Sequence, residues 1–135
     1  MLNVLVVDDS TMAIRNISAY ITSIGHRVVG EATSGAQALK LYKQLKPDLI
    51  TMDITMPEID GITDGITAVK KIIQFDPSAD IIMVTSHGQE SLISKAIQAG
   101  AKGYILKPLN EEKLANAIAA INKKYHQEID DDFLI

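Results

Sequence analysis

Five polar residues in this sequence combine side-chain types that together support phosphoryl chemistry. Each follows a short apolar run, and the five are Asp8, Asp9, Asp53, Thr85 and Lys107. Three carboxylates that lie within a few ångströms of one another repel unless a cation neutralises them. The chain contains no cysteine, so the expected cation is a hard one with oxygen ligands, Mg²⁺, with Mn²⁺ as a substitute.

A carboxylate surrounded by a metal ion, an ammonium and a hydroxyl can form an acyl phosphate, because the neighbouring groups absorb the charge of the phosphoryl group. Lys107 offers a point charge for a phosphoryl oxygen, and Thr85 offers a hydroxyl donor. Taken alone, an Asp after a strand is usually a helix cap, and Lys107-Pro108 could be only a turn. Their joint occurrence at the ends of four strands favours a functional site.

The elements that must position these residues alternate along the chain. Short β-branched runs and helical patterns follow one another five times, which is typical of a parallel sheet with helices on both faces. The predicted strands are 3–7, 27–32, 48–53, 80–86 and 103–107. If the first, third, fourth and fifth strands are neighbours, their carboxyl ends meet at one crevice.

The predicted helices present apolar residues at helical spacing. The residues expected to face the core are Ile14, Ile17, Ile21, Ile24, Ala38, Leu41, Tyr42, Leu45, Ile66, Val69, Ile72, Ile73, Leu92, Ile93, Ala96 and Ile97. Ser34 is placed to cap the second helix, and the fifth helix is expected to begin at Asn110.

Composition narrows the function further. The 135 residues carry a net charge of −4 and no cysteine, which excludes disulfides, thiolate metal sites and a thiol nucleophile. The acidic balance argues against a nucleic-acid partner, and no apolar run is long enough for a membrane span. We therefore expect a soluble, cytoplasmic protein. Four acidic residues fall within 128–135, and the rest of the chain is neutral overall.

The sequence resembles the receiver domain of two-component response regulators, the CheY-like superfamily, over about residues 2–125. The segments that carry the resemblance are VLVVDDS (4–10), DLITMDITMPEIDG (48–61), IMVTS (82–86) and AGAKGYILKP (99–108). The resemblance implies a flavodoxin-like (βα)5 fold, which is a doubly wound five-stranded parallel sheet of strand order 2-1-3-4-5. It also implies a receiver domain, which we expect over residues 1–126. The acidic tail over 127–135 is expected from its composition to be either a disordered end or a short peptide that docks into a groove on a partner or on a second copy.

The resemblance also assigns roles at the site. Asp53 is the expected phosphoacceptor, and Asp8 and Asp9 hold Mg²⁺ together with Asp53 and the backbone carbonyl of Thr55. Lys107 contacts the phosphoryl group, and the Lys107-Pro108 peptide bond is expected to be cis.

Four further expectations concern the surroundings of the phosphoryl group. The resemblance implies that Thr85 moves toward the phosphate while Tyr104 turns inward. This movement is expected to repack the surface made by the fourth helix, the fifth strand and the fifth helix. Thr55 and His87 flank the phosphoryl group and tune the rate of its hydrolysis. A catalytic role for His87 is disfavoured, and a surface or partner contact is the preferred interpretation.

The expected function is that of a stand-alone response regulator, a phosphoacceptor signalling domain rather than an enzyme. A histidine kinase donates the phosphoryl group, and the output is phosphorylation-dependent protein binding, with a chemotaxis role favoured. The expected targets are a flagellar-motor switch or a phosphotransfer protein, with no nucleic acid and no membrane. The protein is expected to be a monomer or a weak phosphorylation-dependent dimer.

Other functions remain open from the sequence. One is a small phosphatase of the haloacid-dehalogenase type, although Asp8 and Asp9 are adjacent rather than spaced as Asp-x-Asp. Another is a relay intermediate that feeds a histidine phosphotransfer protein. A nucleotide-binding module is weaker, since no glycine follows the first strand, and a purely structural pseudo-receiver is disfavoured by the complete acidic set.

A tandem repeat departs from the family pattern. Asp60-Gly61-Ile62-Thr63 is followed at once by Asp64-Gly65-Ile66-Thr67. The family usually has one Asp-Gly, seven residues after its phosphoacceptor, so the spacing marks the second copy as the insertion. The extra residues could add a turn to the third helix or lengthen the loop before it. We favour a longer loop with Asp64 as the helix N-cap.

Overall fold

Five parallel strands form one sheet in the order β2-β1-β3-β4-β5 in the computed structural model, which describes residues 1–121. The strands are β1 (Asn3–Val7), β2 (Arg27–Ala32), β3 (Leu49–Met52), β4 (Ile81–Thr85) and β5 (Gly103–Leu106). The helices are α1 (Thr11–Ser23), α2 (Gly35–Leu45), α3 (Gly65–Phe75) and α4 (Glu90–Ala99), and residues 111–121 form a further helix, the C-terminal helix. The predicted fold class and strand order are confirmed.

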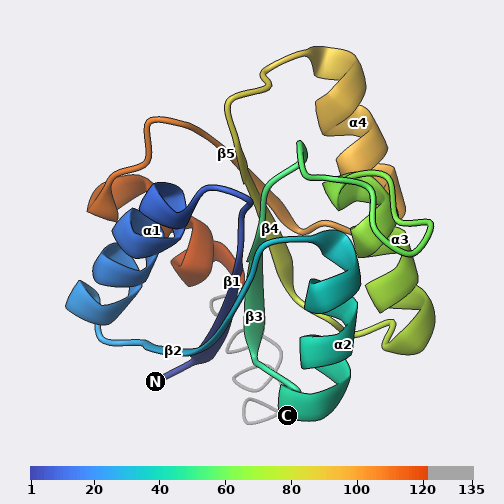
Figure 1. The fold of residues 1–135 in the computed structure, drawn as a ribbon. Coiled ribbons are helices and arrows are strands. Elements are labelled where there is room, and N and C mark those ends of the chain that lie inside the picture. The colour runs from blue at the N-terminus through green and yellow to red at the C-terminus, as the bar shows by residue number, and fades with distance from the viewer. Residues whose placement is uncertain (122–135) are drawn as a thin grey trace, which may run out of the picture.

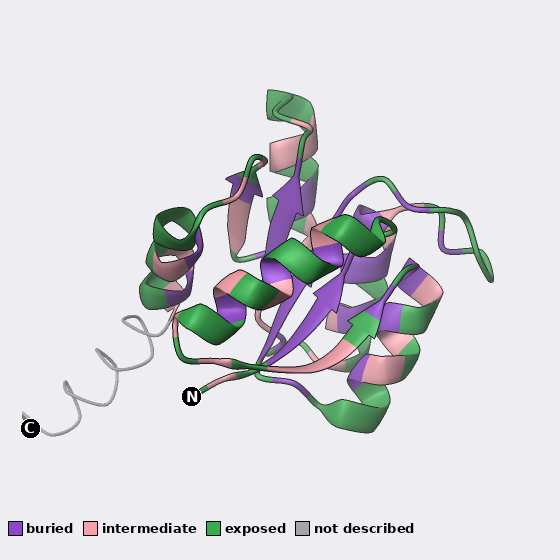
Figure 2. Ribbon diagram, turned by 60° about the vertical axis from the view of Figure 1, so that its left-hand side comes forward, coloured by how far each residue is buried: buried purple, intermediate pink, exposed green. Residues whose placement is uncertain are grey.

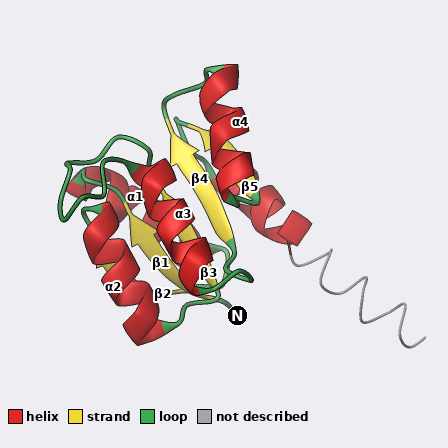
Figure 3. Ribbon diagram, turned by 90° about the vertical axis from the view of Figure 1, so that its right-hand side faces the viewer, coloured by secondary structure: helices red, strands yellow, loops and turns green. Residues whose placement is uncertain are grey.

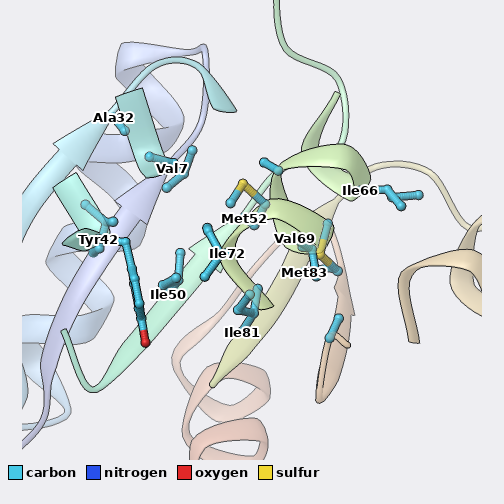
Figure 4. Close-up of a cluster of buried hydrophobic side chains, with 14 of the residues drawn as sticks. Val7, Ala32, Tyr42, Ile50, Met52, Ile66, Val69, Ile72, Ile81 and Met83 are labelled. Carbon is cyan, nitrogen blue, oxygen red and sulfur yellow. The ribbon is translucent and has the colours of Figure 1, made fainter. Parts of the chain in front are cut away.

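The helices cover both faces of the sheet (Figure 1). The side chains of α1 and the C-terminal helix pack on one face, in a cluster that includes Ile17, Ile82 and Leu114. The other face carries α2, α3 and α4 over a larger cluster, part of which is shown in Figure 4. The molecule is therefore a three-layer sandwich with one core on each side of the sheet.

The central strands explain why the sequence contains unbroken apolar runs. The side chains of β3 and β4 are buried along their whole length, and β1 is buried after its first residue (Figure 2). A parallel strand covered on both faces has no solvent side, so its sequence does not alternate. The predicted boundaries for β3, β4 and β5 were slightly too long, and Asp53 and Lys107 lie just outside the strands.

Polar side chains cap α1, α2, α3 and the C-terminal helix, whereas the N-cap of α4 makes no side-chain cap hydrogen bond. The Ser34 hydroxyl accepts a hydrogen bond from the Gln37 amide at 3.2 Å, which confirms the predicted cap of α2.

Two residues predicted to face the core are instead exposed, Leu45 by 41% and Ile97 by 48%. Leu45 is the last residue of α2, and Ile97 is on α4, where only Ala96 is buried. These helices bury a narrower stripe than their apolar residues indicate.

Within residues 1–121, no helix combines the length and apolar character needed to cross a bilayer. The predicted domain boundary after residue 126 and the predicted tail over 127–135 lie outside the described residues.

Candidate functional site

Three carboxylates meet at the carboxyl end of the sheet. Asp8 and Asp9 follow β1 and Asp53 follows β3, and these two strands are adjacent in the sheet. Each carboxylate offers an oxygen within 4.8 Å of the others. Asp8 and Asp53 are buried, with 1% and 7% exposure, whereas Asp9 is exposed. The structure therefore brings together the acidic residues that the sequence predicted to converge.

Lys107 supplies the positive charge of this cluster. Its Nζ atom lies 2.7 Å from Oδ2 of Asp8 and 3.9 Å from Oδ2 of Asp53. The backbone aims the side chain, because β5 pairs with β4 and the Lys107 amide donates to the carbonyl of Thr85 at 2.8 Å. The Lys107-Pro108 peptide bond is cis. One ammonium faces three carboxylates, so the cluster keeps a negative charge.

Backbone amides hold the two buried carboxylates. The amide of Ser10 donates to Oδ1 of Asp8 at 2.9 Å, and the amide of Ile54 donates to Oδ1 of Asp53 at 2.9 Å. The second oxygen of each carboxylate faces Lys107. A backbone amide thus orients one oxygen of each carboxylate, and the other oxygen faces Lys107.

The pKa of Asp53 reflects its burial first and its proximity to a like charge second. Burial raises the pKa of Asp53, and the neighbouring Asp8 carboxylate raises it further. Lys107, the Ile54 amide and the Thr85 hydroxyl act in the opposite direction, but the pKa of Asp53 remains above its ordinary value. A bound cation would remove this penalty, so the site fits a hard, oxygen-ligated metal ion.

Thr85, His87 and Tyr104 form a connected group beside the cluster. Thr85 ends β4 and is fully buried. Its hydroxyl accepts a hydrogen bond from the His87 amide at 3.2 Å, and the Tyr104 hydroxyl donates to the His87 carbonyl at 2.5 Å. Burial and the charge of Asp53 raise the pKa of Tyr104. The backbone of His87 therefore links the two residues that the sequence predicted to act as a switch.

Thr55 and His87 contact each other across the mouth of the site. The Thr55 hydroxyl and Nε2 of His87 are 2.7 Å apart, joining the loop after β3 to the loop after β4. The sequence placed both residues beside the phosphoryl group, and the structure adds that they form a pair. Their predicted effect on hydrolysis stays a prediction.

The tandem repeat lies in the connection between β3 and α3. Asp64 caps α3, because its Oδ1 atom accepts from the Thr67 amide at 2.8 Å. Asp60 and Gly61 both have positive φ and form a turn between Ile59 and Ile62, which pair across it. The predicted N-cap Asp64 is confirmed. The first copy lies in the loop before α3, whereas the second copy provides the N-cap and the first residues of the helix. The predicted lengthening of the loop relative to the family stays a prediction.

Gly65 is a site residue whose individual importance the sequence did not reveal. Its amide donates to the Ile54 carbonyl at 2.8 Å, and a Cβ added at Gly65 would lie 1.9 Å from the carbonyl oxygen of Asp53. α3 therefore packs directly on the backbone of Asp53. The repeated Asp-Gly was the available signal, but it did not distinguish Gly65 from Gly61. The amide donors of Ser10 and Ile54 leave no sequence signal, since every residue except proline has such a group.

Comparisons with known proteins give a consistent result. Residues 4–119 match the response regulator receiver domain. The chain is 48% identical to chemotaxis protein CheY of Bacillus subtilis over 115 residues, covering 85% of this chain and 92% of that protein. It is 43% identical to CheY of Thermotoga maritima over 120 residues, covering 89% and 97%.

A solved structure is also similar throughout the fold. It is the CheX-CheY-BeF3-Mg complex from Borrelia burgdorferi, with a TM-score of 0.83 and 36% identity. The similarity covers 88% of this chain and 87% of that chain.

Proposed function

The chain belongs to the response regulator receiver domain family, and from this premise we propose that it is a stand-alone response regulator of chemotaxis that is phosphorylated on Asp53. CheY-like receiver domains are signalling domains, and this chain is closely related to CheY proteins. One observation carries the proposal. The carboxylates of Asp8, Asp9 and Asp53 offer oxygens within 4.8 Å of one another, and the Lys107 ammonium lies beside two of them.

The phosphoryl donor in this proposal is a phosphohistidine of a histidine kinase. A carboxylate oxygen of Asp53 attacks phosphorus, and the bond between phosphorus and the imidazole nitrogen breaks. The electron pair stays on that nitrogen, which takes up a proton. The Ile54 amide holds Oδ1 of Asp53, so the backbone orients the carboxylate before the donor arrives.

Asp8, Asp9 and Asp53 would hold Mg²⁺, with the backbone carbonyl of Thr55 as a further ligand. When bound, Mg²⁺ offsets the carboxylate repulsion and stabilises negative charge on the phosphoryl oxygens. Receiver domains bind Mg²⁺ at such an acidic pocket, and the similar CheY structure contains Mg. Lys107 would move from Asp8 toward a phosphoryl oxygen, because its Nζ already lies between Asp8 and Asp53.

The signal would pass through Thr85, His87 and Tyr104. In this proposal the Thr85 hydroxyl moves toward a phosphoryl oxygen, which weakens its contact with the His87 amide. The His87 carbonyl accepts a hydrogen bond from the Tyr104 hydroxyl, so a shift of the His87 backbone alters the position of Tyr104. A target protein would then read the changed surface. The CheX-CheY complex supports a protein target for this class of domain.

A phosphorylation assay tests the proposal. Mg²⁺-dependent uptake of phosphate from a small phosphodonor should be measured by mass spectrometry on the wild type and on Asp53→Asn. Asp60→Asn is the matched control, because Asp60 lies in the exposed loop that follows the site. We expect uptake in the wild type and the control and none in Asp53→Asn.

Two outcomes would contradict the proposal. Equal phosphate uptake by Asp53→Asn would place the acceptor elsewhere. Sustained turnover of a small phosphate ester, abolished in Asp53→Asn, would instead favour a phosphatase.

A further inference from the structure

The faces of α2 and α3 are basic although the protein as a whole is acidic. Together these two helices contain four lysines and no acidic residue. Two of the lysines, Lys70 and Lys71, are adjacent on α3 and exposed. α4 adds the exposed Lys95 beside them. A concentration of one charge on a protein of the opposite net charge points to an electrostatic partner.

A groove of about 730 Å³ lies between α3 and α4, which are side by side in Figure 3. Ile73, Leu92 and Ala99 contribute apolar surface to it, and Lys70 and Lys95 line it from opposite helices. The groove can therefore contact apolar side chains while two ammonium groups bind carboxylates.

Within residues 1–121, the ammonium groups of this groove take part in no ion pair. The salt bridges in that range involve Lys102 and Lys107 instead. Asp64 also lines the groove, but its carboxylate accepts from the Thr67 amide at the start of α3. Lys70 and Lys95 thus remain available to a further acidic group.

The sequence contains a segment with matching chemistry. Glu128 and Asp130 to Asp132 provide four carboxylates, and the apolar Phe133-Leu134-Ile135 follows them directly. This segment lies beyond residues 4–119, which match the receiver domain. Its charge complements Lys70 and Lys95, and its apolar residues complement the surface between the two helices.

The topology allows the segment to reach the groove. In a parallel sheet every crossover helix runs opposite to the strands, so the helices end at the edge where the strands begin. Residue 121 therefore lies at the same edge as Gln74 and Ala99, on the other face of the sheet. Helices on opposite faces are roughly 20 Å apart, and the seven residue steps from 121 to 128 span up to ~25 Å when extended.

We propose that the α3–α4 groove binds residues 128–135 of the same chain. The carboxylates pair with Lys70 and Lys95, and the apolar end covers Ile73, Leu92 and Ala99. Such binding would connect the acidic segment to α4, whose preceding loop contains His87. The proposal makes no use of Asp53, so it stands or fails independently of phosphorylation.

Amide chemical shifts of the full chain test this binding. One variant neutralises the segment by Glu128→Gln, Asp130→Asn, Asp131→Asn and Asp132→Asn. A second variant carries Lys70→Gln and Lys95→Gln. The matched control carries Lys71→Gln and Lys40→Gln, which remove the same charge from exposed helix positions outside the groove. Exposed substitutions of this kind alter stability by only about 0.5 kcal/mol, so all variants should fold.

Neutralising the segment should shift the amides of residues 66–74 and 92–99. The groove variant should shift the amides of residues 128–135, and the control should leave them unchanged. Raising NaCl from about 0.1 M to about 1 M should reproduce the effect of the groove variant, because the screening length falls from about 10 Å to about 3 Å. The proposal is overturned if neutralising the segment leaves the amide chemical shifts of the groove unchanged. It is also overturned if the shift changes of the groove amides grow with protein concentration, since the occupant of the groove is then a second copy.

Discussion

Replacing Gly65 by alanine should destabilise the protein far more than the same replacement at Gly61, although the two glycines occupy equivalent places in the tandem repeat. A Cβ at Gly65 would lie 1.9 Å from the carbonyl oxygen of Asp53 and 3.0 Å from Cα of Ile54. Both contacts are with backbone, so no flexible side chain can move aside. At Gly61 nothing lies within 4 Å of an added Cβ.

The size of the effect follows from these distances. α3 must retreat from β3 by roughly 1 Å, which costs about 1–3 kcal/mol as overpacking. The hydrogen bond from the Gly65 amide to the Ile54 carbonyl is weakened at the same time, at a cost of about 1 kcal/mol. A total of about 2–4 kcal/mol corresponds to a fall in Tm of roughly 8–16 °C for a domain of this size. Gly61→Ala carries only the cost of its positive φ, about 1 kcal/mol.

Thermal unfolding of the wild type and both variants measures the difference in stability. Phosphate uptake on Asp53 provides a second readout, because a displacement of 1 Å at a reacting group can cost about 100-fold in rate. Gly65→Ala should lose most of that rate, whereas Gly61→Ala should keep it. Equal losses of Tm in the two variants would refute the close packing of α3 on Asp53.

Three further predictions concern charge and capping. Asp53→Asn should raise the free energy of unfolding in Mg²⁺-free buffer, because the ionised carboxylate of the wild type is buried beside Asp8. Mg²⁺ at 100 times its Kd should add about 2.7 kcal/mol to the free energy of unfolding of the wild type and less to that of the variant. Chemical denaturation with and without chelator measures both effects, and a variant that is less stable than the wild type without Mg²⁺ would contradict the prediction. Asp64→Ala should lower stability by about 1 kcal/mol through loss of the α3 cap, and an unchanged denaturation midpoint would argue against the cap. The Leu2 amide donates to Nδ1 of His26, and burial lowers the pKa of His26. The neutral ring therefore stabilises the fold above a pH of about 6.5, and this stability is lost as the pH falls below that value. The free energy of unfolding, measured at several pH values, should decline less in His26→Gln than in the wild type, and identical declines would exclude His26 as the cause.

Much of the fold and of the candidate site could be predicted from local pattern. The strands are short apolar runs because β1, β3 and β4 are covered on both faces, and that burial is recorded directly in the residue types. Asp8, Asp53 and Lys107 follow such runs, and the carboxyl ends of parallel strands meet at one edge. Their convergence therefore needs only the order of the strands in addition to the sequence.

Helix periodicity gave wrong predictions of burial where burial depends on the elements that surround the helix. Leu45 and Ile97 continue the apolar stripes of α2 and α4, but neither is buried. A stripe shows which face of a helix turns inward, whereas the width of the buried region depends on the elements packed against it. The elements that pack against a helix are distant from it in sequence. The periodicity of the helix therefore cannot predict how wide its buried stripe is.

By itself, the sequence determined the alternation of strands and helices, the acidic cluster and the positive charge beside it, since each depends on residue type and local spacing. Only the tertiary structure decided which glycine of the repeat lies against Asp53 and which histidine atoms link Thr55, Thr85 and Tyr104. The two repeat copies are identical as far as Thr63 and Thr67, so no local preference separates them. The distinction arises because Gly65 packs against the backbone that follows β3, whereas Gly61 lies in a turn with open space around it.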